Sequence, residues 1–458
     1  MLRRRTYFFL ALLVGFLSVV VFNLYHYQGF SSNSEPTTRH MSDSKSIIVI
    51  GGGLAGLSAA HTAFGRGYSV VLLDKQPSLG GNSVKASSGI NGAGTPAQTA
   101  HGIVDSSEAF ANDTNASAGP LARPALIQTL TAQSAAALAW LSEPPFNVDL
   151  SLVSRLGGHS IPRTHRGKGG APGWAMTSAL IKALDPGKAD GRIQVINGAR
   201  VVKLVERDGA VSGVEYEQQG ERKSLAGTAV ILATGGYAAD FSTTGLLAQY
   251  RPDLLETPTA SGGHATGDGH RLAASLNSPA ALWDMDQVQV HPTGFIDPAQ
   301  PEAHTKFLAA EALRGSGGLL IDSKGERFFD EMGRRDAVTA AMQKVAEAGR
   351  GPVRLVLGPK GAEALKAHCD FYVGKGLMKR HTDTASLADE MGLHLEDLSK
   401  TFHAHNSYKR GEQTDPFGKV HFHDEEFDIN APLLVAQITP VVHYVRIVLV
   451  MMIGLTES

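Results

Sequence analysis

Three glycines near the start of the chain have the spacing of a phosphate-binding turn. Gly51, Gly53 and Gly56 fit the pattern G-x-G-x-x-G directly after the apolar run Ile47–Ile50. Apolar residues then recur at helical spacing, so the pattern predicts a buried strand, a tight turn and a helix. The glycines would let the backbone approach a pyrophosphate, which the helix N-terminus faces. A second apolar run ends in Asp74, whose carboxylate can accept a hydrogen bond from a ribose hydroxyl. These features together predict a dinucleotide site.

The segments that follow favour FAD over NAD as the dinucleotide. A second Gly/Ser-rich loop, LGGNSVKASSGING, comes directly after Asp74 and suits a long ligand lying across the domain. The stretch VINGARVVKLVERDGAVSGVEYE predicts a β-meander with Asp-Gly turn chemistry. It leads to AVILATGGY, a predicted strand that ends in two glycines. The candidate cofactor-binding residues are Gly51, Gly53, Ala55, Gly56, Asp74, Gly81, Asn82, Ser83, Ser88, Gly89, Thr234, Gly235, Gly236 and Asp268.

The composition excludes several other functions. The chain has 458 residues with 42 basic and 44 acidic side chains, so it has no basic field to hold nucleic acid. Its single cysteine, Cys369, excludes an internal disulfide and cysteine-ligated iron–sulfur clusters. The histidines between 402 and 426 have no carboxylate or cysteine at metal-ligand spacing, so we expect no metal site. Redox chemistry in this chain would therefore need a cofactor that requires no thiolate.

The N-terminal residues have the pattern of a membrane anchor. Three arginines precede an apolar run from Tyr7 to Phe22, which is near the ~17–25 residues that span a bilayer. We expect residues 1–27 to form a transmembrane or signal-anchor helix, with the arginines on the cytosolic side. A polar linker over 28–45 would follow. We therefore expect the protein to be tethered to the membrane of the endoplasmic reticulum. A cleaved signal and a mitochondrial presequence stay open as alternatives, and the second would place the protein in the mitochondrion.

Several longer motifs resemble one known family. GGNSVKASSGING, ILATGGY, HATGDGH, HPTGF, EALRGSGGLLIDSKGERFFDE and TPVVHY are similar to the flavoprotein of the fumarate reductase/succinate dehydrogenase family. The soluble single-chain fumarate reductases of fungi are the branch that they resemble most, from about Ser46 to Tyr444.

This resemblance implies an α/β fold with a Rossmann-like FAD-binding domain that carries the β-meander. That domain would span 46–285 and resume at 443–458, and an α+β capping domain would span 286–442. A dicarboxylate, fumarate or succinate, would bind between the domains. The implied reaction is FAD-dependent reduction of fumarate to succinate, with a reduced flavin or another donor supplying the electrons.

The resemblance also implies roles for individual residues. His291 in HPTGF and His443 in VVHY match the histidines that bind substrate carboxylates. Glu311 and Arg314 in EALRG match a proton relay, and Arg335 matches the proton donor. Simpler interpretations stay open: a His-Pro turn at 291, a solvated i, i+3 pair at 311 and 314, and a surface charge at 335.

Two positions depart from the family pattern. Asn82 stands where covalent members of the family attach FAD to a histidine, so we expect non-covalent FAD. Ala310 stands where bacterial relatives carry a threonine that contacts the substrate, so we expect that contact to be lost.

The last residues depart from the family pattern more strongly. VRIVLVMMIGLTES follows the expected His-Tyr where relatives carry glycine-rich segments and a further substrate arginine. We therefore expect the chain as written to bind FAD weakly and to show little activity. A read-through intron, a real isoform and a reduced protein are the alternative origins of this ending. The competing functions are a non-catalytic flavoprotein fragment and a related FAD-dependent enoate reductase or dehydrogenase of the same class.

Overall fold

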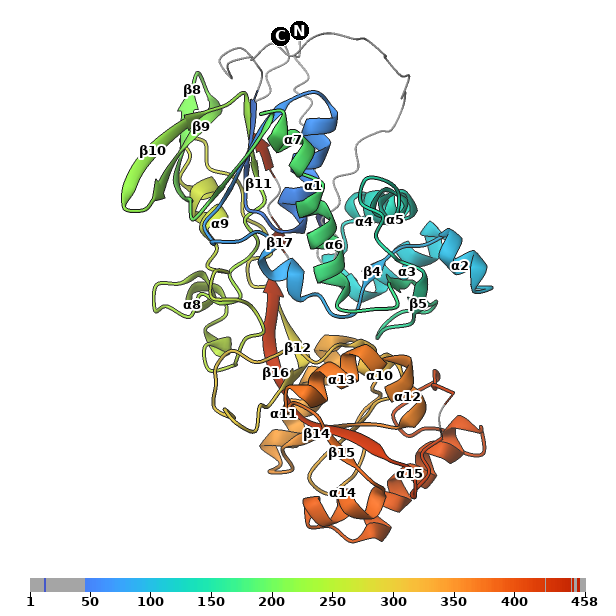
Figure 1. Ribbon diagram of the computed structural model, residues 1–458. Helices are drawn as coiled ribbons and strands as arrows, with labels where there is room; N and C mark the ends of the chain where they lie inside the picture. The colour runs from blue at the N-terminus through green and yellow to red at the C-terminus, as the bar shows by residue number, and fades with distance from the viewer. Residues whose placement is uncertain (1–11, 14–45, 425, 446, 449–450, 454–458) are drawn as a thin grey trace.

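The computed structural model describes residues 12–13, 46–424, 426–445, 447–448 and 451–453. An upper body holds a mostly parallel sheet, and a lower body holds an antiparallel sheet with its own helices (Figure 1). The long strand β16 (Leu433–Val445) runs from one body toward the other. The chain therefore has a mixed α/β fold.

Most of the predicted anchor and all of the linker lie outside the described residues. From that segment the structure describes β1 (Leu12–Leu13), which pairs antiparallel with β17 (Ile447–Val448). Within the described part of the chain, no helix is both long enough and apolar enough to cross a bilayer. The anchor over 1–27 remains a prediction.

The upper sheet forms where the sequence predicts buried apolar strands. β2 (Ser46–Ile50), β3 (Ser69–Asp74), β7 (Ile193–Asn197) and β11 (Ala229–Leu232) pair in parallel in the order β11-β2-β3-β7. Residues of both faces are buried in β2 and β3, as expected of continuous apolar runs with helices on each side. β18 (Met451–Ile453) pairs antiparallel with β11 at the open edge.

Helices and short sheets cover this parallel sheet. α1 (Leu54–Gly65) follows β2, and the buried apolar residues of α1 and α6 (Pro172–Lys182) share one core with β2 and β3. The remaining helices of this body are α2 (Pro96–Ala100), α3 (Ser107–Ala118), α4 (Pro124–Ala132), α5 (Ser134–Ser142), α7 (Asp185–Ala189), α8 (Leu246–Tyr250) and α9 (Asp268–Ala274), with 3-10 turns at Gly81–Lys85, Gly119–Leu121 and Pro252–Leu254. A small sheet joins β4 (Ile90–Asn91), β6 (Thr164–Arg166) and β5 (Leu152–Ser154).

The predicted β-meander is present but begins later than expected. β8 (Arg200–Arg207), β9 (Ala210–Gln218) and β10 (Glu221–Ala226) form an antiparallel sheet. Asp208 and Gly209 make the turn between β8 and β9 with positive φ angles of 51° and 78°, as this turn type requires. The first residues assigned to the meander, VIN, instead belong to β7, because that apolar run completes the buried parallel sheet.

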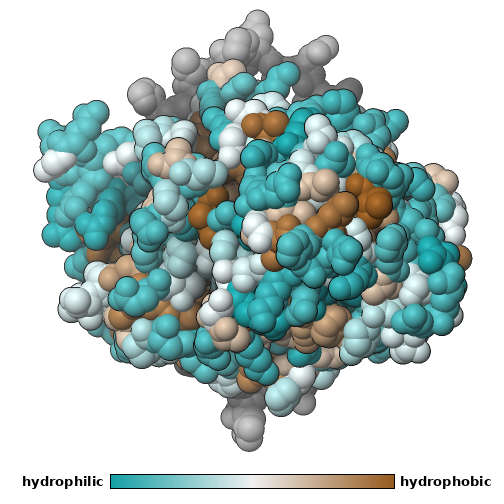
Figure 2. Space-filling model, turned by 90° about the horizontal axis from the view of Figure 1, so that it is seen from below, coloured by the Kyte–Doolittle hydropathy of each residue, from teal (hydrophilic) through white to brown (hydrophobic). Residues whose placement is uncertain are grey.

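The lower body is built on an antiparallel sheet whose strands come from distant segments. β12 (Val288–Phe295), β16, β14 (Val353–Leu357) and β13 (Leu319–Ile321) pair in that order, and β15 (Lys379–His381) also pairs with β16. Two apolar clusters cover the sheet. The helices are α10 (Ala312–Gly315), α11 (Arg335–Glu347), α12 (Pro359–Ala364), α13 (Lys366–Gly374), α14 (Thr384–Met391) and α15 (Leu395–Lys409). Seen from below, the surface is mainly hydrophilic, and apolar side chains gather in separate patches (Figure 2).

Candidate active site

A cavity of about 990 Å³ opens at the carboxyl ends of the parallel strands. Its wall combines the turns after β2, β3 and β11 with the loop at 260–268 and with residues of the lower body. Ligands of open α/β sheets bind at this edge. The volume lies at the upper end of the ~300–1,000 Å³ typical of small-molecule and cofactor sites.

The glycine turn forms because no side chain would fit there. Gly51 has φ +102°, and a Cβ on it would lie 2.3 Å from the carbonyl oxygen of Ala233. A Cβ on Gly56 would lie 1.7 Å from the carbonyl oxygen of Gly51. Both glycines are therefore needed to bring α1 against the strand ends, so that the helix N-terminus faces the cavity.

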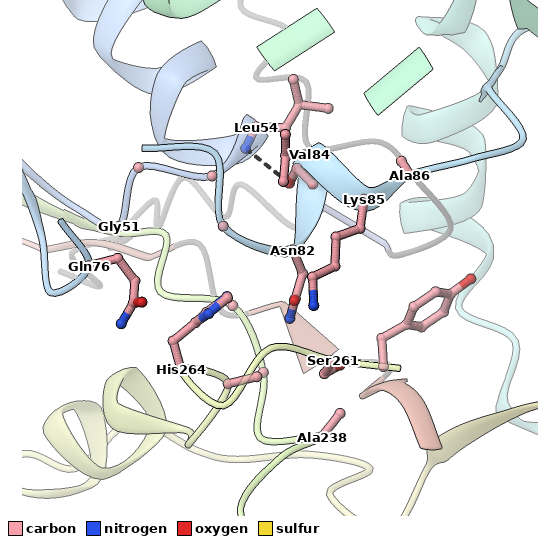
Figure 3. A pocket seen from close by; sticks show the side chains of 18 of the residues that line it. Gly51, Leu54, Gln76, Asn82, Val84, Lys85, Ala86, Ala238, Ser261 and His264 are labelled. Atoms are coloured by element: carbon pink, nitrogen blue, oxygen red, sulfur yellow. Dashed lines mark hydrogen bonds between the residues drawn. The ribbon is translucent and has the colours of Figure 1, made fainter. Parts of the chain in front are cut away.

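Two side chains fix the turn from the neighbouring loop and strand. The backbone N–H of Leu54 donates to Ser83 Oγ at 3.1 Å (Figure 3), and the N–H of Gly52 donates to Asp74 Oδ2 at 2.7 Å. Asp74 Oδ1 also accepts from the N–H of Gln76 at 2.7 Å. Asp74 thus orders the strand ends in addition to lining the cavity.

The predicted cofactor-binding residues divide into two groups. Those that line the cavity are Gly51, Gly53, Ala55, Asp74, Gly81, Asn82, Ser83, Thr234, Gly235, Gly236 and Asp268. The other three do not line the cavity and instead contact other parts of the protein. Gly56 packs on Gly51, Ser88 Oγ accepts from the N–H of Ala312 at 3.4 Å, and a Cβ on Gly89 would lie 2.3 Å from the carbonyl oxygen of His165.

The cavity has the chemistry that an FAD molecule needs. Its glycine turn offers close backbone approach, and Lys75 and Lys85 line the wall with positive charge. Asn82 and Lys85 project toward Ala238, Ser261 and His264 on the opposite side (Figure 3). These residues would hold the dinucleotide, and His443 and Tyr444 of β16 line the same cavity.

Beyond this cavity, Arg335 is the centre of a polar group joined by short hydrogen bonds. It is the first residue of α11, its Nε donates to Glu311 Oε2 at 2.7 Å, and its Nη2 also bonds this oxygen. Arg335 Nη1 donates to Gln289 Oε1 at 2.7 Å and to the Tyr444 hydroxyl. The side chain of Arg335 is only 16% exposed, so the surface-charge interpretation is wrong.

Glu311 joins the two arginines of the predicted relay. Its Oε1 lies 3.3 Å from Arg314 Nη2, and both side chains are almost fully buried. The interpretation as a solvated helix pair is therefore also wrong. Burial alone would raise the pKa of Glu311, but the charges of Arg335 and Arg314 outweigh it and lower the pKa to about 2. Glu311 is a carboxylate at neutral pH.

The two predicted substrate histidines lie together. His291 is on β12 and His443 on β16, and their ring centroids are 5.2 Å apart. The register of the two strands explains this, because His291 is opposite Val441 and Gln289 is opposite Tyr444. The backbone N–H of Thr293 donates to His291 Nδ1 at 3.2 Å, so the proton of the neutral ring is on Nε2.

Both histidines are neutral in this environment. Burial lowers the pKa of His291 and of His443 well below 6.5, and the charge of Arg335 lowers each further. The positive charge at the site therefore comes from Arg335 and Arg314, and each histidine can offer a neutral N–H donor.

Sequence reasoning missed several residues at the site. Gln289 and Tyr444 bond Arg335, while Lys85, His368 and Tyr372 line the cavity. His368 Nε2 lies 2.8 Å from the carbonyl oxygen of Ser87 and so connects the two bodies. The sequence could have predicted Gln289 at the site, because it is two residues before His291 and so lies on the same face of the strand. His368 and Tyr372 have none, because they come from a helix far along the chain.

Comparison with known proteins assigns the chain to a family. The model of the FAD binding domain family matches residues 46–447. The chain belongs to this family of FAD-binding flavoproteins. It is 43% identical to a fumarate reductase of Schizosaccharomyces pombe over 403 residues, covering 87% of this chain and 77% of the relative. It is 39% identical to fumarate reductase 1 of Saccharomyces cerevisiae, covering 87% of this chain and 85% of the relative.

A solved structure agrees with this assignment. The open conformation of a flavocytochrome c3 fumarate reductase superposes with a TM-score of 0.64 and 29% identity, covering 88% of this chain and 68% of that one. The FAD-binding flavoprotein fold thus extends over both bodies described above.

Proposed function

We propose that this flavoprotein reduces fumarate to succinate with bound FAD. The observation that carries this function is the bonding of Arg335 to Glu311 on one side and to Tyr444 on the other. Tyr444 and His443 line the FAD cavity, so the arginine lies next to the place where the substrate would meet the cofactor. The names of the fungal relatives support the same reaction.

The electrostatics of the site suit a dicarboxylate. Two buried arginines against one carboxylate leave a net positive charge among Arg335, Arg314 and Glu311. The two carboxylates of fumarate would balance this positive charge. The N–H groups of His291 and His443 would donate hydrogen bonds to the carboxylate oxygens. Preorganised donors of this kind stabilise charge that develops on the substrate during the reaction.

Proton delivery is the task of this chain's own residues. When bound in the cavity, FAD would supply the hydride for one carbon of the double bond. Arg335 gives a proton to the other carbon, where the carbanion beside a carboxylate is more basic than a guanidine. Burial would lower the pKa of Arg335, but the Glu311 carboxylate raises it, so the arginine is protonated before the reaction. Glu311 and Arg314 would then pass a replacement proton to Arg335.

The decisive experiment uses the purified holoenzyme with reduced viologen as the electron donor. We expect fumarate to oxidise the viologen and one succinate to form for each two electrons consumed. Urocanate serves as the control, because it has one carboxylate instead of two and should be reduced far more slowly. An FAD-loaded enzyme that leaves fumarate unchanged would falsify the proposed function.

Two finer features are part of the proposal. FAD would be held without a covalent bond, since Asn82 has no nucleophile to attach it and its Oδ1 already accepts from the N–H of Gly262 at 2.8 Å. Residues 1–27 would tether the enzyme to a membrane, most simply that of the endoplasmic reticulum, because three arginines precede the apolar run. Carbonate extraction of cell membranes tests the tether. Recovery of the intact chain in the soluble fraction would contradict it.

A further inference from the structure

Four buried charged side chains form a group next to the proposed proton relay. None of the four is a member of the relay itself. Arg327 bonds Glu331 through Nε at 2.7 Å and Nη2 at 2.9 Å, and bonds Asp415 Oδ2 through Nη1 at 2.5 Å. Lys419 Nζ donates to Glu331 Oε2 at 2.9 Å. We call Arg327, Glu331, Asp415 and Lys419 the cap cluster.

The cap cluster is almost completely removed from water. Its four side chains are at most 4% exposed. Each buried ion loses its hydration, and only good geometry and further hydrogen bonds compensate for that loss. The cluster meets this condition, because two cations balance two carboxylates and Arg327 makes a bidentate pair with Glu331.

The cap cluster also joins two segments far apart in the chain. Arg327 and Glu331 are in the loop between β13 and α11, while Asp415 and Lys419 come after α15. Asp415 Oδ1 accepts from the N–H groups of Phe417 at 2.8 Å and Lys419 at 3.4 Å, so it shapes its own loop as well. The loop that leads into Arg335 is thus fixed at Glu331.

The main chain of Glu331 is the link to the relay. Its carbonyl oxygen accepts from Arg314 Nη1 at 2.5 Å. In the part of the chain that the structure describes, Arg314 Nε and Nη2 have no hydrogen-bond partner, although Nη2 lies 3.3 Å from Glu311 Oε1. The carbonyl of Glu331 is therefore the close contact that sets where the Arg314 guanidinium lies.

We propose that the cap cluster is a positioning device for proton delivery, in which Lys419 and Asp415 hold Glu331 so that its carbonyl aligns Arg314 with Glu311. This inference rests on the proposed fumarate reduction. The cluster touches neither substrate nor FAD. Its effect is to keep the Arg314–Glu311–Arg335 chain in contact after each turnover, when Arg335 must regain its proton.

The test compares Lys419→Met with the parent holoenzyme and with Lys379→Met. Lys379 forms an exposed ion pair with Glu390 on the same body, so its loss controls for removing one lysine charge. We expect kcat of Lys419→Met to fall about 10- to 100-fold, as for a misplacement of about 1 Å. KM for fumarate and FAD content should stay within about twofold of the parent, and the solvent deuterium isotope effect on kcat should increase.

These readouts separate positioning from a merely structural role. A structural role would lower FAD content together with kcat and would leave the isotope effect unchanged, whereas thermal stability falls in both cases because Glu331 loses a buried partner. Either that pattern or a kcat of Lys419→Met within twofold of the parent would overturn the inference. Asp415→Asn serves as a second variant if Lys419→Met does not fold, since it keeps an acceptor for its loop while removing the charge beside Arg327. It should lower kcat and increase the isotope effect to a smaller degree, and a parental result would equally overturn the inference.

The same experiment distinguishes failure of the inference from failure of the proposed function. An active parent with unaffected variants removes the positioning role alone. A parent that holds FAD but does not reduce fumarate removes both, because no proton relay would then need alignment.

Discussion

The imidazole rings of His291 and His443 lie edge to face, with their centroids 5.2 Å apart and their planes at 72°. The two residues are 152 positions apart in the sequence, yet antiparallel pairing of β12 with β16 brings them together. Both strands belong to the sheet of the lower body, while His443 also lines the FAD cavity of the upper body. The two histidines that we propose as substrate donors are therefore on one sheet, and the end of this sheet lines the cavity.

Arg335→Lys should remove activity while leaving FAD bound. A lysine cannot reproduce the separate bonds that Arg335 makes to Glu311, Gln289 and Tyr444. Loss of a positioned general acid costs about 10²–10⁴-fold, so we expect kcat to fall by at least about 100-fold. Arg334, the adjacent exposed arginine, provides the control substitution Arg334→Lys. Turnover of Arg335→Lys within tenfold of the parent would remove Arg335 from the role of proton donor.

Gly56→Ala should abolish FAD binding. Its new methyl group would lie 1.7 Å from the carbonyl oxygen of Gly51, so α1 would have to leave the strand ends. Gly65→Ala is the matched control, because it is on the same helix and its Cβ has no heavy atom within 4 Å. We expect Gly65→Ala to be neutral or to stabilise the protein by up to about 1 kcal/mol. Flavin absorbance per protein checks both variants, and normal flavin content in Gly56→Ala would contradict the predicted collision.

The nucleotide-binding half of the fold is the part that the sequence predicts well. Its signals are local, because the apolar runs of β2 and β3 and the glycines between them lie within about 30 residues. The meander boundary is the exception. The VIN run is apolar enough for either sheet, and only tertiary pairing with β3 assigns it to β7.

The site could be predicted only where a motif carries its residues. Glu311, Arg314 and Arg335 are in motifs, and the structure joins them, because Glu311 forms ion pairs with both arginines. The protonation of the histidines was not predictable, because it depends on burial and on Arg335, which is 44 positions from His291. The bond between Arg327 and Asp415 spans 88 positions, and both residues look like ordinary surface charges in the sequence.

FAD should leave the denatured protein. Asn82, at the position where a covalent link would form, has an amide that cannot attack the flavin and that already bonds the N–H of Gly262. Acid or heat precipitation of purified holoenzyme should therefore release all yellow colour into the supernatant, where its fluorescence and chromatographic mobility identify FAD. Flavin that remains with the precipitate after washing in denaturant would show that a covalent bond exists elsewhere.

Moderate acid should weaken the fold through His405, which faces the cap cluster. His405 is 3% exposed in α15 and packs against the rings of Phe422 and Phe427. Burial, together with the nearby charge of Lys419, lowers its pKa to about 4. In the unfolded chain a histidine binds a proton below pH ~6.5. The unfolded state therefore holds more protons than the folded state between pH 6.5 and 4, so stability falls as pH falls through this range.

The expected size follows from the same difference. A pH of 5 is about 1.5 units below the pKa of a histidine in the unfolded chain, and the folded state binds almost no proton there. Protonation therefore stabilises the unfolded state by about 2 kcal/mol relative to the folded state. His405→Phe keeps an aromatic ring among Phe422 and Phe427 and removes the titration. Denaturant unfolding at pH 7.5 and 5.0 should show that the variant loses about 2 kcal/mol less stability than the parent over this interval. If both proteins lost the same stability between pH 7.5 and 5.0, His405 would bind its proton in the folded protein. The cap cluster would then tolerate a further positive charge beside it.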